Sequence, residues 1–293
     1  MSFFDKRRRR KQRKPSRAGL DGKPLCSCPC TQAQLQSDKF QRWAARMHEQ
    51  PMFMHRKIWE NCYIAQALQE RGMLAPGRQG LGFAVGQEPL SALFASLGCE
   101  IIATDAEPTV STARHWVENA QHADSLEVMN LRGVCMPELF RERVRFRFAD
   151  MRYLPDSLGE YDFIWSACAL EHLSTMALGE EFIYQSLKYL KPGGVAVHTT
   201  EFNVSSNFWT WTTGTCVMFR RRDIQRVAHV LRQRGYKVEL DFNTGDLPYD
   251  HVIDKPRLGH AQPYKQEIHL KFLLDKYVVT SFGLIIEKTF DVS

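Results

Sequence analysis

Short apolar runs alternate with amphipathic stretches along the chain from about residue 80 to residue 288. Seven runs have the length and composition of strands: 80–85, 99–105, 144–150, 161–168, 195–202, 236–242 and 277–288. Between them, apolar residues recur every three or four positions, which is typical of helices over 88–97, 110–123, 179–190 and 223–234. Strands that alternate with helices in this way predict an α/β fold with a doubly wound, mostly parallel sheet.

The first 75 residues follow a different pattern. Residues 38–75 carry apolar groups at helical spacing and predict a helical extension, which the residues APG at 75–77 bring to an end. Residues 1–37 contain few large apolar groups and many charges, so we expect a disordered basic tail. The remaining residues, 76–293, form the predicted α/β domain.

The net charge of +6 is concentrated in the tail. The first 17 residues contain nine Lys or Arg and one acid, a local charge of +8, which leaves about −2 for the rest of the chain. A near-neutral domain favours a small-molecule partner, while the tail offers a salt-sensitive electrostatic attachment to nucleic acid. There is neither an export signal nor an apolar run of about 20 residues, so we expect a cytoplasmic protein without a membrane span.

Three of the eight cysteines are bunched in the sequence CSCPC. Their alternate-residue spacing does not match the C-x2-C pairs of structural zinc sites, and no second Cys or His pair follows. We therefore expect reduced thiols and no metal site.

A glycine turn after the first predicted strand points to a ligand site. Gly86 allows close approach of the backbone, and the helix that follows offers unpaired N–H groups to a ligand. Asp105 ends the second predicted strand, where a carboxylate can accept hydrogen bonds from both hydroxyls of a ribose. The glycine loop alone is a weak signal, and the strand that ends in an acid strengthens it.

Three further motifs follow in order: RFRFADMRYLP, YDFIWSACALEHL and LKYLKPGGVAVHTTEF. Together with the glycine turn they resemble the class I S-adenosylmethionine-dependent methyltransferases, in particular the branch with EHL and LKPGG motifs. The resemblance extends well over residues 80–202 and loosely to residue 288. It implies a Rossmann-like methyltransferase fold with a seven-stranded sheet, an antiparallel C-terminal strand and S-adenosylmethionine as the cofactor.

The resemblance also implies roles for individual residues. Gly86 would line the methionine end of the cofactor and Asp105 would hold its ribose. Asp150 and the backbone of Met151 would frame the adenine. Ser166 would border the transfer site, with Glu171 and His172 beginning the next helix.

The first motif departs from the family pattern, because it keeps one glycine and lacks the usual acid before it. The positive ammonium and sulfonium of the cofactor then need another partner, and Glu88 is the candidate. The alternative interpretation of Glu88 is an acid that stabilises a helix N-terminus through the helix dipole.

Methyl transfer from a sulfonium depends mostly on alignment and exclusion of water, and a general base is needed when the acceptor must lose a proton. His172, His198 and Glu201 follow or end predicted strands and are the candidate bases. Substrate choice is expected to come from insertions near 203–214 and 244–270. The helix around 55–66 is a further candidate, with Trp59 and Tyr63 as lid or as core residues.

The sequence thus favours methyl transfer to a small-molecule acceptor, such as a hydroxyl or amine of a sugar or glycoconjugate precursor. An RNA or protein methyltransferase tethered by the basic tail is the alternative. A third interpretation is a cofactor-binding protein without catalytic activity.

Overall fold

The computed structural model describes residues 23–49, 53–110, 122–255 and 268–290. Five parallel strands form the centre of the main sheet, in the spatial order β5 (Val144–Phe148), β4 (Glu100–Asp105), β3 (Gln79–Phe83), β6 (Tyr161–Ala167) and β7 (Leu190–Asn203). The chain enters at β3, winds outward to β5 and then returns to β6, so the sheet is doubly wound. The predicted Rossmann-like α/β class is confirmed.

Beyond β7 the sheet continues with antiparallel pairings. The long C-terminal strand β11 (Tyr277–Glu287) pairs antiparallel with β7, as predicted. On its other edge lie β10 (Lys271–Leu274), which pairs with β8 (Ile253–Asp254), and β1 (Cys28–Pro29). The sheet therefore has nine strands within the described part of the chain, two more than predicted. A separate parallel pair joins β2 (Met54–His55) to β9 (Ile268–His269).

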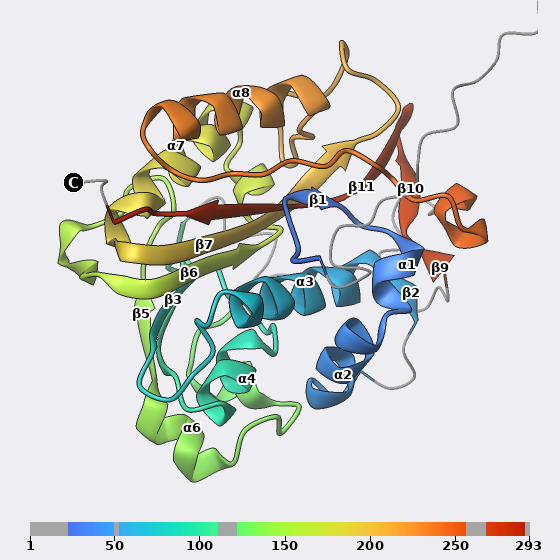
Figure 1. The fold of residues 1–293 in the computed structure, drawn as a ribbon. Helices are drawn as coiled ribbons and strands as arrows, with labels where there is room; N and C mark the ends of the chain where they lie inside the picture. Colours follow the sequence, from blue (N-terminus) through green and yellow to red (C-terminus); the bar gives the residue numbers. More distant parts are fainter. Residues whose placement is uncertain (1–22, 50–52, 111–121, 256–267, 291–293) are drawn as a thin grey trace, which may run out of the picture.

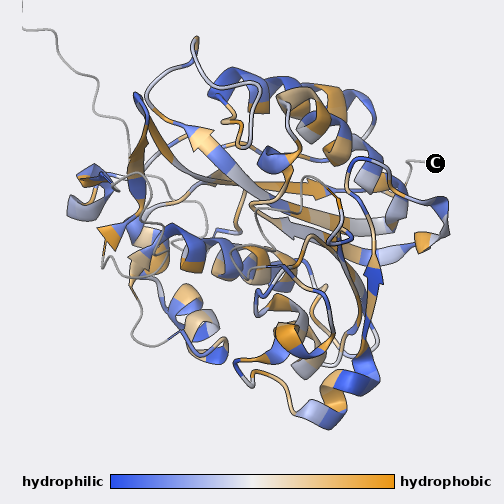
Figure 2. Ribbon diagram, turned by 180° about the vertical axis from the view of Figure 1, so that it is seen from behind, coloured by the Kyte–Doolittle hydropathy of each residue, from blue (hydrophilic) through white to orange (hydrophobic). Residues whose placement is uncertain are grey.

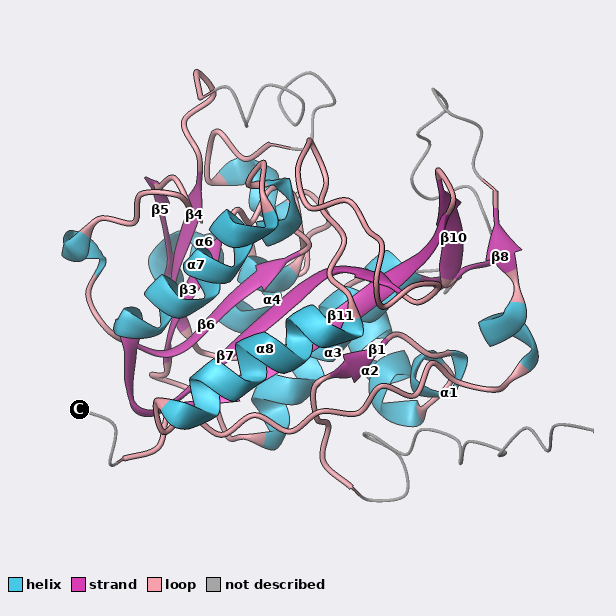
Figure 3. Cartoon of the chain, turned by 90° about the horizontal axis from the view of Figure 1, so that it is seen from above, coloured by secondary structure: helices cyan, strands magenta, loops and turns pink. Residues whose placement is uncertain are grey.

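Helices cover both faces of the sheet (Figure 1). On one face lie α3 (Arg56–Glu70) and α4 (Leu90–Ser96), with α2 (Asp38–Arg46) outside α3 and α6 (Pro137–Arg143) beside α4. On the other lie α7 (Met176–Ser186) and α8 (Arg221–Gln233), which run side by side in Figure 3. The α8 ribbon is striped with hydrophobic and hydrophilic residues in Figure 2, and its buried side chains include Ile224, Val227 and Leu231. None of the helices described combines the length and the apolarity needed to cross a bilayer.

The predicted disordered tail extends too far along the chain. Residues 23–37 are not disordered, because Leu25, Cys28, Cys30 and Leu35 are fully buried and residues Gln32–Leu35 form the short helix α1. Residues 1–22 lie outside the described part, so the basic tail itself stays a prediction. The tail boundary was misplaced because the buried cysteines behave as small hydrophobic residues.

Residues 236–242 do not form the predicted strand, because the N-terminal segment takes most of that edge. The Ser27 N–H donates to the carbonyl of Glu239 (3.0 Å) and its carbonyl accepts from Asp241 N (2.8 Å), while its hydroxyl accepts from Ile285 N of β11 (2.9 Å). Only Lys237 still pairs with β11, at Glu287. The predicted helix 110–123 lies largely in 111–121, outside the described residues.

The contact of β11 with α3 leads to a stability prediction. A Cβ added at Gly283 would lie 2.0 Å from Cε1 of Tyr63, a fully buried ring on α3. We expect Gly283→Ala to lower the free energy of unfolding by roughly 2–3 kcal/mol through overpacking. Chemical denaturation measures this, with Gly72→Ala as control. Its Cβ would meet no atom within 4 Å, so only backbone strain of about 1 kcal/mol is expected. Equal losses in both variants would contradict the packing argument.

Candidate functional site

A cavity of about 440 Å³ opens at the carboxyl ends of the central parallel strands. The turns after β3, β4, β5 and β6 form its walls, and the first turns of α3 close one side. This is the place where doubly wound sheets bind ligands, because the strand order reverses between β3 and β6 and separates the adjoining loops. The predicted residues that line it are Gly86, Glu88, Asp105, Asp150, Met151 and His172.

The turn after β3 keeps a glycine-like shape although it has a single glycine. Ala84 has φ +48° and Gly86 has φ +50°, so both adopt the left-handed conformation. The N–H of Val85 between them bonds to the carbonyl of Thr104 at 3.1 Å. Ala84 therefore occupies a position that favours glycine. The turn keeps its shape with a single glycine because Ala84 adopts the strained left-handed conformation.

We expect Ala84→Gly to raise the free energy of unfolding by about 0.5–1 kcal/mol, because glycine adopts this φ without the clash of a Cβ atom. Urea denaturation provides the measurement. Ala92→Gly, inside α4, should instead destabilise the protein by about 1 kcal/mol or more, since glycine is a poor helix former and Ala92 is buried. A destabilised Ala84→Gly variant would show that the left-handed turn is not strained.

Asp105 is held rigidly at the end of β4. One carboxylate oxygen accepts from the N–H groups of Gly86 (3.2 Å) and Ala123 (3.1 Å), and the other accepts from Ala106 (2.8 Å). His122 Nε2 lies 3.8 Å away. Burial raises the pKa of Asp105 above its ordinary value, although these donors oppose the shift. The side chain thus fixes the glycine turn to the cavity wall and presents acceptor oxygens to a ligand.

Glu88 lines the cavity just before α4, which begins at Leu90. Its Oε1 accepts a hydrogen bond from the indole Nε1 of Trp165 at 2.5 Å. Burial, with Asp105 nearby, raises the pKa of Glu88 to about 8 in spite of the Trp165 bond. The carboxyl group is therefore oriented by β6, and a cation in the cavity would favour its ionised form.

Asp150 and Met151 follow β5 on the opposite wall. Arg152 holds both oxygens of Asp150, with Nη2 at 2.6 Å and Nε at 3.0 Å. Burial alone would raise the pKa of Asp150, but the Arg152 hydrogen bonds keep it below its ordinary value. Asp150 is thus an ionised hydrogen-bond acceptor beside the buried Met151 side chain. The positive charge of Arg152 offsets part of its negative charge.

Ser166 and His198 do not line the cavity. They face each other within the sheet, where Ser166 Oγ lies 2.9 Å from His198 Nδ1 and both residues are buried. Burial lowers the pKa of His198 to about 3, so the ring is neutral. The prediction of His198 as a general base and of Ser166 at the transfer site is not supported by this placement. Ser166 lies one position before the end of β6, and His198 lies five positions before the end of β7.

The other two candidate bases differ in position. His172 lines the cavity, and its Nδ1 lies 2.7 Å from the carbonyl of Thr215. A carbonyl only accepts, so Nδ1 carries the hydrogen and Nε2 is the nitrogen that can take up a proton. Glu201 is buried behind the cavity wall, where its Oε1 pairs with Arg56 Nη2 at 2.5 Å.

A buried charged cluster beside the cavity was missed in the sequence. Arg56 bonds Glu60 (3.2 Å) and Ser281 (3.0 Å), and Lys57 also contacts Glu60 (3.2 Å). Charge on Lys57 and Arg56 holds the pKa of Glu60 below its ordinary value although burial opposes this. Lys57, Glu60 and Asn61 line the cavity, whereas Trp59 and Tyr63 are core residues. Three charged residues within "HRKIWEN" were the only signal in the sequence.

Comparisons with known proteins add limited information. No family model matches the chain, and no curated protein sequence matches it. A putative sarcosine dimethylglycine methyltransferase from Galdieria sulphuraria has a TM-score of 0.47 at 15% identity, over 80% of this chain and 88% of that one. Magnesium protoporphyrin IX methyltransferase from Synechocystis PCC 6803, with bound SAH, has a TM-score of 0.45 at 14% identity, over 88% and 97%. At these scores the function must be inferred from the site.

Proposed function

We propose that the chain binds S-adenosylmethionine in this cavity and transfers its methyl group to a small-molecule acceptor. The observation that carries the proposal is the convergence of the left-handed glycine turn, Asp105 and Asp150 around one cavity at the reversal of strand order. When bound, the cofactor supplies an activated methyl group on a positively charged sulfur.

The described residues fit the parts of this cofactor. Asp105 presents carboxylate oxygens to a ribose diol, and Gly86 leaves room for the amino-acid end. Glu88 lies next to that turn and would balance the ammonium group. Asp150 and Met151 would accept and cover the adenine on the opposite wall.

The acceptor side of the cavity is formed by the turn after β6 and by α3. Cys168, Ala169 and His172 lie on the first, and Lys57 and Asn61 on the second. His172 is the proposed base for an acceptor that must lose a proton, through Nε2. The hydrogen bond to the Thr215 carbonyl fixes the orientation of the His172 ring. A ring held in this way would also orient an acceptor that is hydrogen-bonded to Nε2.

We propose a sugar or glycoconjugate precursor, reacting through a hydroxyl or amine, as the acceptor. The support is the loop 203–214, in which Trp209 is 76% exposed and Trp211 is 37% exposed. Exposed indole rings stack well on sugars, and the loop follows β7 next to the acceptor side of the sheet.

The experiment that tests the proposal is transfer of a labelled methyl group from S-adenosylmethionine to a panel of sugar nucleotides, lipid-linked sugars, RNA and protein. Label in a small-molecule acceptor supports the proposal. Label only in RNA or protein would replace the acceptor class with that of a tethered macromolecular enzyme. If calorimetry detects no binding of S-adenosylmethionine, the proposed cofactor is wrong.

A further inference from the structure

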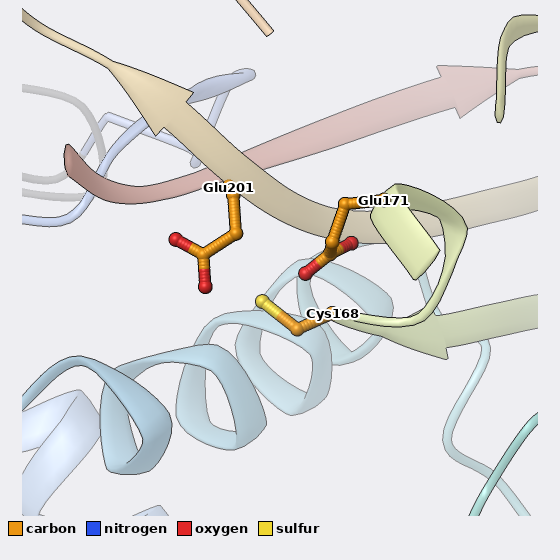
Figure 4. A group of neighbouring side chains, drawn as sticks. All are labelled: Cys168, Glu171 and Glu201. Carbon is orange, nitrogen blue, oxygen red and sulfur yellow. The ribbon is translucent and has the colours of Figure 1, made fainter. Parts of the chain in front are cut away.

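Three buried side chains at the acceptor side of the cavity point at one another (Figure 4). Cys168 follows β6, Glu171 lies on the short helical turn η3 (Leu170–His172), and Glu201 projects from β7. One thiol sulfur and one oxygen from each carboxylate all lie within 4.8 Å of one another. Glu171 is 0% exposed and Glu201 is 5% exposed, so bulk water does not reach them.

The cluster contains two acceptor atoms that the protein leaves unsatisfied. Glu171 Oε1 and Glu201 Oε2 have no hydrogen-bond partner among the described residues, although both are buried. The second oxygen of each carboxylate is occupied, since Thr200 Oγ1 donates to Glu171 Oε2 (3.2 Å) and Arg56 holds Glu201 Oε1 (2.5 Å). Buried polar atoms without partners are rare and require an explanation.

The charges of the metal-free cluster are balanced. Burial raises the pKa of the Cys168 thiol and raises the pKa of Glu171 to about 8, so both groups favour the protonated form, while Arg56 and Lys57 offset Glu60 and Glu201. A divalent cation that binds here would displace these two protons, which leaves the net charge of the cluster unchanged.

The backbone holds the sulfur in place at a cost. Cys168 has φ +46°, a conformation that residues other than glycine rarely adopt. Two contacts hold it there, since its N–H points to both the carbonyl (3.1 Å) and the hydroxyl (3.0 Å) of Thr199. Strained residues of this kind persist where the surrounding structure fixes them, frequently at functional sites.

We propose that Cys168, Glu171 and Glu201 bind a zinc ion that supports the acceptor wall of the cavity. A thiolate with two carboxylates suits zinc, while the hard cations magnesium and calcium disfavour sulfur ligands. Thr200 and Arg56 then orient the carboxylates from outside, as second partners of metal ligands commonly do. The ligands are separated by up to 33 positions in the sequence, and they do not include the CSCPC cysteines, so spacing rules could not find them.

The test is titration of the metal-free full chain with Co²⁺, which reports a thiolate ligand through sulfur-to-cobalt charge-transfer absorption. We expect one equivalent of Co²⁺ to produce the band and one equivalent of Zn²⁺ to abolish it. Cys168→Ala should remove the band. Glu171→Gln and Glu201→Gln should each weaken Co²⁺ binding by at least the ~10- to 100-fold that loss of an outer partner causes.

Cys99→Ala is the matched control, since Cys99 is another buried thiol and its Sγ contacts the Met73 and Ala75 carbonyls instead. It should keep the band and the affinity. Thermal melting of each variant without metal separates loss of ligand from loss of fold, and Glu171→Gln preserves the side-chain shape. No band in the wild-type chain, or a band that survives in folded Cys168→Ala, would overturn the proposal. Neither result depends on binding of the methyl donor.

Discussion

Asp105→Asn is expected to weaken S-adenosylmethionine binding by roughly 10- to 100-fold, the range given by about 1.5–3 kcal/mol for a hydrogen bond to a charged group. The carboxylate offers only acceptor atoms, and it must serve three backbone N–H groups and a ribose at once. An amide replaces one acceptor oxygen by a donor, which faces either the turn N–H groups or the ribose hydroxyls. Isothermal calorimetry measures the change directly.

Asp162→Asn is the matched control, because Asp162 lies near the other end of the same sheet. It pairs with Arg78 (2.7 Å) and Lys191 (3.3 Å) near the start of β6 and does not line the cavity. We expect this variant to lose some stability and to keep its affinity for the cofactor. Equal affinity in Asp105→Asn and the wild type would show that Asp105 only braces the turn.

Glu88→Gln is expected to remove a pH dependence of cofactor binding centred near pH 8. The carboxyl group of Glu88 is protonated below a pKa of about 8 in the unliganded protein, so its attraction for the cofactor ammonium grows as the pH rises through that value. The cofactor amine also titrates in this range. The difference between wild-type and Glu88→Gln affinities from pH 6.5 to 9 therefore isolates the carboxylate, and we expect it to reach about tenfold at pH 9.

The Glu88 carboxyl group is expected to give the stability of the protein a pH dependence opposite in sign to that of cofactor binding. A carboxyl group with a raised pKa keeps its proton in the folded state at pH values where the unfolded chain has released it. The free energy of unfolding contributed by Glu88 therefore falls as the pH rises from 4.5, the ordinary pKa of a glutamate side chain, to about 8. Glu88→Gln should flatten this part of the stability profile, as measured by urea denaturation at each pH. A profile unchanged by the substitution would contradict the raised pKa.

The central sheet could be predicted because each of its strands is a short apolar run bounded by turn residues. Two features of the N-terminal segment could not be predicted from the sequence. The N-terminal segment displaced residues 236–242 from β11 through Ser27, a contact between positions 258 residues apart. Leu25, Cys28 and Cys30 are buried although their neighbours in the sequence are mostly small or polar. Pairings of this kind depend on tertiary structure, and local composition carries no signal for them.

The cofactor side of the site followed from the ends of strands, where Gly86, Asp105 and Asp150 meet around the cavity. Two residues that lie within strands were wrongly predicted to face the cavity. Ser166 and His198 belong to neighbouring strands, so their side chains meet each other within the sheet. The charged residues of α3 were missed because the approach of that helix to β7 and β11 is not encoded in its apolar pattern.

A crystal structure of the chain with S-adenosylhomocysteine tests the central claim most directly. We predict the ribose hydroxyls within hydrogen-bond distance of Asp105, the adenine between Asp150 and Met151, and the amino-acid end beside Gly86 and Glu88. A ligand bound elsewhere, or a cavity still empty at saturating ligand with Asp105 bonded solely to its own turn, would contradict it.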